Sequence, residues 1–303
     1  MNSKNKKGMS LAILAATLYA INSPFSKLML DYMPSTLMAG FLYIGAGVGM
    51  AIIALLQKLS GHNRQEEKLS KTELPYTIAM IVLDIVAPIC LLLGLSMTTA
   101  ANASLLNNFE IVATSFIALL FFKEQISPRL WLGIIAITIS CMILSFEDIN
   151  SLHFSKGSLF VLIAACCWGL ENNCTRKISS KDPLQIVLLK GIFSGGSSLI
   201  IGFAIGERSK TLWIIPCALL LGFVAYGLSI YTYVYAQRLL GASRTSAYYA
   251  IAPFVGVLLA LIIFHDIPEI SFFIALLFML LGAWLSSNDT LLKDIFKKRK
   301  SAD

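Results

Sequence analysis

The sequence reads LYAINSPFSK at residues 18–27 and, 149 positions later, CWGLENNCTR at residues 167–176. The two stretches agree in chemical type, with an aromatic ring near the start of each, at Tyr19 and Trp168, and a cation at the end. Similarity at a fixed offset indicates two copies of one unit. Each copy carries amide or acidic side chains among apolar residues, so polar groups are expected at matching depths in both.

Composition indicates that these stretches lie in a membrane. Of the 303 residues, 57% are hydrophobic and 14% are charged, whereas ordinary globular proteins have roughly 45–50% and 25%. The mean hydropathy is +0.76. These values exclude disordered, fibrous and secreted disulfide-rich proteins, and the connections are too short for a soluble catalytic domain. We expect a polytopic helical membrane protein, because a helix satisfies its own backbone hydrogen bonds in lipid.

Apolar runs between charged or turn-rich breaks predict ten membrane-spanning helices, each near the roughly 20 residues that a bilayer requires. The expected spans are residues 9–30, 34–57, 75–97, 101–122, 129–146, 157–177, 183–206, 212–236, 244–264 and 271–288. The expected fold class is therefore an all-α integral membrane protein with ten transmembrane helices.

Further matches extend the repeat along the chain. The offset of 149 aligns the prolines that open the second and seventh spans, and an offset of 142 aligns residues 119–124 with residues 261–266. We expect residues 1–150 and 151–303 to form two five-helix repeats. Because five is odd, the copies cross the bilayer in opposite senses, and such inverted repeats are typical of transporters whose site lies near the midplane between the copies.

Basic residues predict the orientation. With the N-terminus placed in the cytoplasm, 19 Lys and Arg residues fall on the inner side and 3 on the outer side. Because cytoplasmic loops carry the excess of Lys and Arg, both termini are expected in the cytoplasm. The basic tail at residues 297–300 is interpreted as a topology signal that touches anionic lipid, so no nucleic-acid partner is expected.

The six cysteines lie within apolar runs and are interpreted as small packing residues. Neither they nor the three histidines show the spacing of metal ligands. No metal or cofactor is expected, and the cysteines do not indicate a redox compartment.

Three acidic residues are expected inside the spans, where a charged side chain costs roughly 2.5–3.5 kcal/mol. They are Asp84, Glu110 and Glu171. A buried carboxyl can carry a proton through a conformational cycle, and Glu171 is the first choice for such coupling. Asp84 could instead pair with Lys190 or stay protonated, and Glu110 could be held by Asn107 and the start of its helix. Lys190 itself is expected to extend its ammonium towards the inner surface.

Amide and aromatic side chains at matching depths predict a cavity between the repeats. The candidate cavity residues are Tyr19, Asn22, Asn107, Asn108, Trp168, Asn172, Tyr226 and Tyr249. Pro24 removes a backbone hydrogen bond in the first span, so a kink is expected beside Asn22, with a helix cap by that amide as the alternative. The polar run at residues 171–173 points in three directions around its helix, either towards a cavity or towards hydrogen bonds with other helices.

Glycine-rich runs at residues 45–49 and 191–196 occupy corresponding positions in the second and seventh spans. Small residues let membrane helices approach closely. The two runs therefore predict close helix contacts, either as sliding surfaces or as a rigid seam.

The whole pattern resembles the drug/metabolite transporter superfamily, specifically its ten-helix EamA-type bacterial members. The resemblance covers nearly the whole chain; its best matches are residues 105–110 with Glu124, residues 167–176, and residues 250–253 with Asp266. Members of this family often have a proline after the glutamate of the fourth span, where this chain has Ile111. The resemblance implies a bacterial inner membrane location and export or exchange of amino acids, related metabolites or toxic organic compounds by alternating access.

The expected function is secondary transport of a small molecule. An intramembrane enzyme would need a Ser–His pair, two aspartates or metal ligands within the spans, and the expected spans contain one aspartate and no histidine. The sequence has no nucleotide-binding loop, so ATP hydrolysis by this chain is not expected. A membrane receptor or structural protein without transport activity is the alternative, and flux in reconstituted vesicles would separate the two. The oligomeric state is not indicated.

Overall fold

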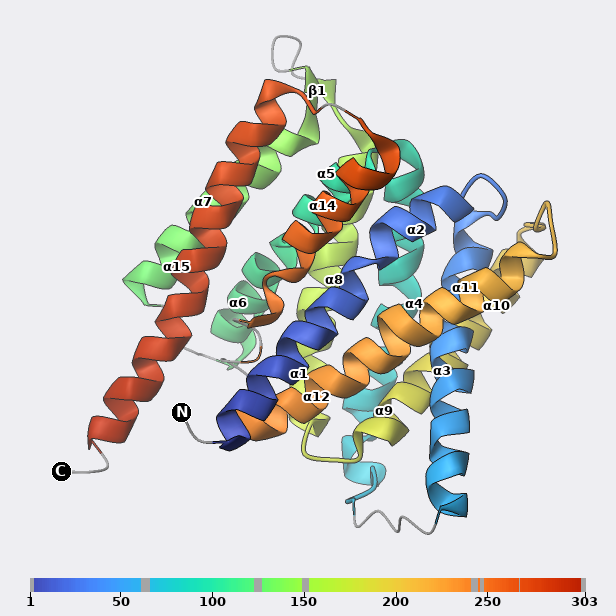
Figure 1. Cartoon of the computed structure of the whole chain (residues 1–303), viewed down its shortest axis with the longest axis horizontal. Helices are drawn as coiled ribbons and strands as arrows, with labels where there is room; N and C mark the ends of the chain where they lie inside the picture. The colour runs from blue at the N-terminus through green and yellow to red at the C-terminus, as the bar shows by residue number, and fades with distance from the viewer. Residues whose placement is uncertain are drawn as a thin grey trace.

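The computed structural model describes residues 3–60, 66–122, 127–148, 153–240, 245, 248–266 and 268–300. This part of the chain is a bundle of helices with one short antiparallel strand pair (Figure 1). The start of α1 and the end of α15 lie at the same end of the bundle. That arrangement agrees with an even number of crossings.

The first half of the chain contributes α1 (Ser3–Ala20), α2 (Asn22–Met29), α3 (Ser35–Leu59), the 3-10 turn η1 (Lys71–Glu73), α4 (Leu74–Met97), α5 (Ala100–Leu106), α6 (Phe109–Phe122) and α7 (Pro128–Ser145). The strands β1 (Phe146–Asp148) and β2 (His153–Phe154) pair between the halves. The second half contributes α8 (Lys156–Ile178), α9 (Pro183–Leu189), η2 (Lys190–Ser194), α10 (Gly195–Ala204), α11 (Ile214–Gly222), η3 (Phe223–Leu228), α12 (Ser229–Leu240), α14 (Ala252–Phe264) and α15 (Ile270–Lys300).

Seven helical segments among the described residues are long and apolar enough to cross a membrane. They are Lys6–Met29, Ser35–Leu59, Lys71–Met97, Ala100–Phe121, Pro128–Ser145, Pro183–Ala204 and Ile214–Leu240. Two shorter apolar helices cover Ala252–Phe264 and Ile270–Ser286. α8 is as long as the seven, but the polar run at residues 171–173 lowers its hydropathy. The protein is thus a multi-pass helical membrane protein, and the count of ten crossings stays a prediction.

Helices from the two halves alternate in the bundle. α4 packs along α8, and α1 packs along α12 (Figure 1). α7 pairs with α15 at one side, while α3 packs against α10 and α11. Each of these contacts joins the first half of the chain to the second. The boundary between the repeats near residue 150 is a prediction.

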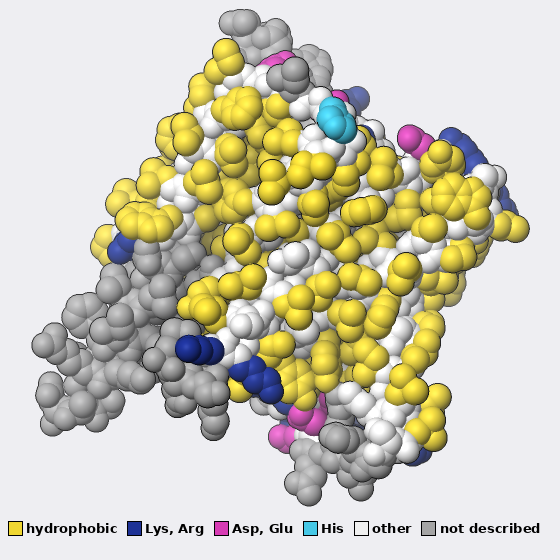
Figure 2. Space-filling model, in the orientation of Figure 1, with side chains coloured by type: hydrophobic (Ala, Val, Ile, Leu, Met, Phe, Trp, Pro, Cys, Tyr) yellow, Lys and Arg dark blue, Asp and Glu magenta, His cyan; other side chains and the backbone are white. Residues whose placement is uncertain are grey.

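Apolar side chains cover the face shown in Figure 2, and charged side chains gather towards its two ends. Leucine, isoleucine and phenylalanine side chains stay largely exposed along several helices, for instance Leu120, Ile200 and Leu277. A soluble protein rarely exposes so continuous an apolar surface. The surface therefore matches the hydrocarbon of a bilayer.

Glycines bring α3 into backbone contact with the second half. A Cβ added at Gly191 would lie 2.3 Å from the Cα of Gly47, and one added at Gly45 would lie 2.0 Å from the carbonyl oxygen of Leu219. Only glycine allows backbones to approach this closely. The close contact predicted from the two glycine runs is confirmed.

The kink expected beside Asn22 in the first span also occurs. α1 ends at Ala20 and α2 begins at Asn22, so the chain bends one turn before Pro24. Ile21 rather than Asn22 is the N-cap residue of α2, and no side chain caps it. The bend therefore releases the Asn22 amide for contacts with other helices.

Candidate functional site

A cavity of about 90 Å³ lies inside the bundle. It is lined by Tyr19, Tyr43, Asp84, Glu110, Trp168, Glu171, Asn172, Thr175, Lys190, Tyr226, Ile230, Tyr233, Val234 and Tyr249. These residues come from both halves of the chain, and most of them are polar or aromatic. Polar and charged side chains are costly inside a membrane and are typical of functional sites. The cavity that they line is therefore the candidate functional site.

Three charged side chains meet in the wall of this cavity. The Lys190 ammonium lies 2.5 Å from Glu171 Oε1 and 3.1 Å from Asp84 Oδ2. All three residues are buried, with exposed fractions of 4%, 4% and 1% respectively. Asp84 belongs to α4, Glu171 to α8, and Lys190 opens η2, so the cluster joins the first half to the second.

Hydroxyl groups also bond to both carboxylates in this cluster. The Tyr43 hydroxyl donates to Asp84 Oδ1 at 3.0 Å, and the Thr175 hydroxyl donates to Glu171 Oε1. Removing a charge from water costs several kcal/mol per ion, and pairing offsets that cost only when the remaining lone pairs are also bonded. The two hydroxyl groups therefore offset part of the cost of burying this cluster, and Asp84 Oδ2 keeps only its ion pair with Lys190 among the described residues.

Glu110 is the third acid at the cavity, and its surroundings differ. It lies in the first turn of α6, where the helix dipole favours a negative charge. The Asn172 amide donates to Glu110 Oε1, whereas the expected contact with the Asn107 side chain is absent because that amide turns to Tyr19. Among the described residues Glu110 forms no ion pair, so its carboxyl is held by an amide alone.

Aromatic rings form much of the remaining wall. The Tyr19 ring lies 6.4 Å from that of Trp168 and 6.0 Å from those of Tyr226 and Tyr249, measured between centroids. The rings of Tyr43 and Tyr226 are 4.9 Å apart. Rings packed at such distances hold one another in place, so the wall offers fixed aromatic faces and hydroxyls.

Two asparagines act behind this wall rather than in it. The Asn22 side chain donates to the Tyr226 hydroxyl at 2.9 Å, and the Asn107 side chain donates to the Tyr19 hydroxyl at 3.0 Å. The Ser26 hydroxyl in turn donates to the side-chain oxygen Oδ1 of Asn22 at 3.1 Å. These amides fix the orientation of two cavity tyrosines.

The structure thus brings together eight of the eleven residues that the sequence singled out. Lining the cavity are Tyr19, Trp168, Asn172, Tyr226, Tyr249, Asp84, Glu110 and Glu171. Asn22 and Asn107 support the wall from behind. Asn108 is buried between α5 and α6, and its amide nitrogen finds no hydrogen-bond partner in the described part of the chain.

Sequence reasoning missed Lys190 as a site residue. The expected extension of its ammonium to the inner surface is wrong, because the side chain turns inward to the two carboxylates; the alternative pairing with Asp84 is the one observed. Tyr43, Thr175 and Tyr233 were also missed. Thr175 belongs to the same repeat segment as Glu171 and Asn172, whereas Tyr43 lies in the second span, where the sequence predicted no site residue.

Two π-helical segments carry site residues. Lys190 is the first residue of η2, and Tyr226 lies inside η3. A π-helical turn holds an additional residue, which changes the direction of the side chains around it, and such turns are frequent at functional sites. The turns therefore help to aim Lys190 and Tyr226 into the bundle, a feature that hydrophobic periodicity does not reveal.

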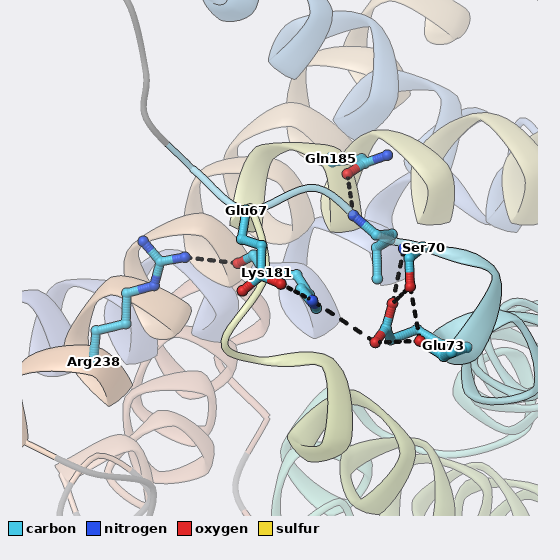
Figure 3. A network of polar contacts seen from close by, with 8 residues as sticks. Glu67, Ser70, Glu73, Lys181, Gln185 and Arg238 are labelled. Atoms are coloured by element: carbon cyan, nitrogen blue, oxygen red, sulfur yellow. Dashed lines mark hydrogen bonds and ion pairs between the residues drawn. The ribbon is translucent and has the colours of Figure 1, made fainter.

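At the end of the bundle where α1 begins, a second charged network joins the halves (Figure 3). The Arg238 guanidinium contacts Glu66 Oε1 and the Lys181 carbonyl oxygen, both at 2.6 Å. Lys181 pairs with Glu67, whose carboxylate raises the pKa of that ammonium. Gln185 accepts from the Leu69 backbone N–H at 2.9 Å. The network ties the chain before α4 to α9 and α12.

The opposite end of the bundle is hollowed. A pocket of about 530 Å³ lies there, lined by residues that include Lys27, Thr98, Asn102, Phe264 and Asp266. The Lys27 ammonium donates to the carbonyl oxygens of Leu95 and Thr98, at 2.6 and 2.8 Å. The two ends therefore differ, since one is tied by ion pairs and the other is open.

Comparison with known proteins agrees with this architecture. The profile of the EamA-like transporter family matches residues 6–146 and again residues 155–288. An uncharacterized transporter of Methanothermobacter thermautotrophicus is 27% identical over 290 residues, which cover 91% of this chain and 84% of the relative. The uncharacterized transporter YyaM of Bacillus subtilis is 24% identical over 177 residues, 55% of this chain and 58% of the relative. A solved crystal structure superposes with a TM-score of 0.67 at 14% identity, covering 94% of this chain and 98% of that one.

Proposed function

Because the chain belongs to the EamA-like transporter family, we propose that it is a secondary transporter that exports or exchanges a small metabolite, such as an amino acid or related organic compound. The observation that carries this proposal is the buried Asp84–Lys190–Glu171 cluster at a cavity between the halves. Buried charges are weak contributors to stability, whereas polar groups inside a membrane mark transport pathways. A transport role accounts for their presence.

The two ends of the bundle support alternating access. The Arg238–Glu66 and Lys181–Glu67 pairs bridge one end, and the opposite end holds the pocket of about 530 Å³. In the proposed cycle these pairs separate as the pocket narrows, so that the central cavity faces each side in turn. By the distribution of basic residues, the bridged end faces the cytoplasm of a bacterial inner membrane, with both termini on that side.

Coupling to protons would use the acids at the cavity. Glu171 stays the first candidate, since it bonds both Lys190 and Thr175. A proton added to Glu171 would weaken its pairing with Lys190 and thereby loosen the contact between α8 and η2. Glu110 and Asp84 are the second and third candidates. In this proposal, titration of Glu171 changes the packing of α8 against η2 beside the cavity.

The experiment that tests transport starts from cells with and without the protein. A metabolite profile identifies a compound that accumulates or is depleted, and its flux is then measured in liposomes that hold the purified chain. We expect saturable flux that empty liposomes lack. Specific binding without any flux across the bilayer would favour a receptor, and neither binding nor flux for any candidate compound would favour a structural membrane protein.

A further inference from the structure

The charges at the central cavity are strongly unequal. Three carboxyl groups face it, those of Asp84, Glu110 and Glu171, and among the described lining residues Lys190 is the one cation. That ammonium is already shared between Asp84 and Glu171. An anionic substrate would therefore meet carboxylates and a cation already engaged, whereas a cationic substrate would meet complementary charge.

The protein also shows which cation these carboxylates accept. A primary ammonium, that of Lys190, lies 2.5 Å from one carboxylate and 3.1 Å from the other. It reaches them on a flexible side chain from η2. An ammonium group has three donors and no acceptor, so a free amine could form the same bonds if the lysine withdrew.

The aromatic wall suits the rest of such a molecule. Tyr19, Trp168, Tyr226 and Tyr249 surround the space next to the carboxyl groups. Aromatic faces attract cations and also bury alkyl groups. At about 90 Å³ the cavity holds a few water molecules or a small organic group, and it is smaller than the roughly 300–1,000 Å³ of sites for drug-sized ligands.

We propose that the substrate is a small cationic amine without a carboxylate, and that its ammonium competes with the Lys190 side chain for Glu171 and Asp84. Glu110, which bonds only an amide among the described residues, receives the incoming ammonium first. Lys190 is then a tethered competitor that occupies the substrate position when the site is empty. This inference rests on the proposed transport function; it narrows the substrate from amino acids and related compounds to amines without a carboxylate, and it adds the role of Lys190.

If Lys190 competes with the substrate, its removal should strengthen amine binding. Removal of a lysine with only a structural role would not have this effect. The substitution Lys190→Ala removes the competing side chain and leaves empty the space that its ammonium occupied. If the Lys190 ammonium occupies the site in most molecules, only the remaining fraction can bind the amine. The apparent affinity for the amine is then the intrinsic affinity multiplied by that fraction. We therefore expect the Lys190→Ala variant to bind small alkylamines about tenfold more tightly than the unmodified protein.

Binding is measured by the rise in unfolding temperature of the detergent-purified chain on adding ligand. The probes are propylammonium, the neutral propionamide, the anionic propionate and the zwitterion alanine. Propylammonium should stabilise the Lys190→Ala variant at lower concentration than it stabilises the unmodified protein. Propionamide, propionate and alanine should not stabilise the variant. Lys58→Ala, at an exposed lysine near the end of α3, is the matched control and should leave the response to propylammonium unchanged.

A double variant, Lys190→Ala with Asp84→Asn, covers the case in which the single variant does not fold, because it leaves one carboxylate for the added amine. Stabilisation by alanine or propionate in preference to propylammonium would overturn the proposed substrate class. Equal or weaker amine binding after loss of Lys190 would overturn the competition. Neither result depends on flux, so amine binding without transport would contradict the proposed function and leave only the amine site and its competition with Lys190 standing.

Discussion

Two clusters of charged side chains join the halves of this molecule, and they lie in opposite surroundings. In the buried cluster, Asp84, Lys190 and Glu171 meet inside the bundle with almost no exposed surface. In the end network, Arg238 and Glu66 pair at the edge of the bundle, with side-chain exposed fractions of 26% and 21%. Both bridge the two halves, but water screens only the second.

The contrast shows that similar ion pairs serve different purposes. An exposed pair such as Arg238–Glu66 is worth about 0–1 kcal/mol and is weakened by salt, so it can break and re-form at little cost. The buried cluster pays a large desolvation penalty, and hydrophobic residues of the same volume would often be at least as stable. Its presence is therefore better explained by ligand or proton binding than by stability.

The largest effect on stability is expected from breaking the buried cluster. Lys190→Met leaves two buried carboxylates without a cation, and the free energy of unfolding should fall by about 3–5 kcal/mol. Denaturant unfolding of the purified chain in detergent measures this loss. Lys58→Met, at an exposed position, should change the same quantity by less than about 0.5 kcal/mol. Similar losses of unfolding free energy in the two variants would mean that the buried ion pairs of Lys190 do not stabilise the fold.

A smaller effect is expected at the glycine contact, which joins the halves without charge. In Gly191→Ala the new methyl group meets the backbone of Gly47 at 2.3 Å, and separating α3 from η2 should cost about 1–3 kcal/mol. Gly196→Ala is the matched control, because an added Cβ there meets no atom within 4 Å. If both alanine variants unfolded alike, the close contact would not limit stability.

The smallest effect on stability is expected at the end network. Arg238→Gln should lower the free energy of unfolding by about 0.2–1 kcal/mol, and the difference from the unmodified protein should shrink in high salt. The loss caused by Lys190→Met should keep its size in the same salt series, because those charges are buried. A salt response of equal size at both clusters would remove the distinction between them.

The sequence predicted the bundle well because its signals are local. Apolar runs and the 149-residue offset located the helices and the repeated polar segments, and α8 was recognised despite its polar run at residues 171–173. The bend before Pro24 was also predictable, because proline has no backbone N–H to donate to the helix. No sequence pattern indicated the β1–β2 pairing between the halves.

The centre of the site was predictable in part. Repeat alignment identified Tyr19, Trp168 and Glu171 as residues at matching depth, and all three line the cavity. The sequence offered the pairing of Lys190 with Asp84 only as an alternative, because a long side chain near a helix end can reach either the surface or the interior. That choice depends on two acids from other helices and on the π-helical turn η2, which are properties of the packed structure.

The most direct test compares one glutamate from each cluster in the same flux assay. Glu171→Gln and Glu67→Gln remove a carboxylate charge with little change in shape, and both variants are reconstituted in liposomes with the unmodified chain as reference. If transport is coupled to protons through the buried cluster, Glu171→Gln abolishes accumulation driven by a pH gradient and keeps downhill exchange measurable. Glu67→Gln keeps accumulation within a few-fold of the reference. Full accumulation by Glu171→Gln would contradict the account, as would equal loss in the two variants.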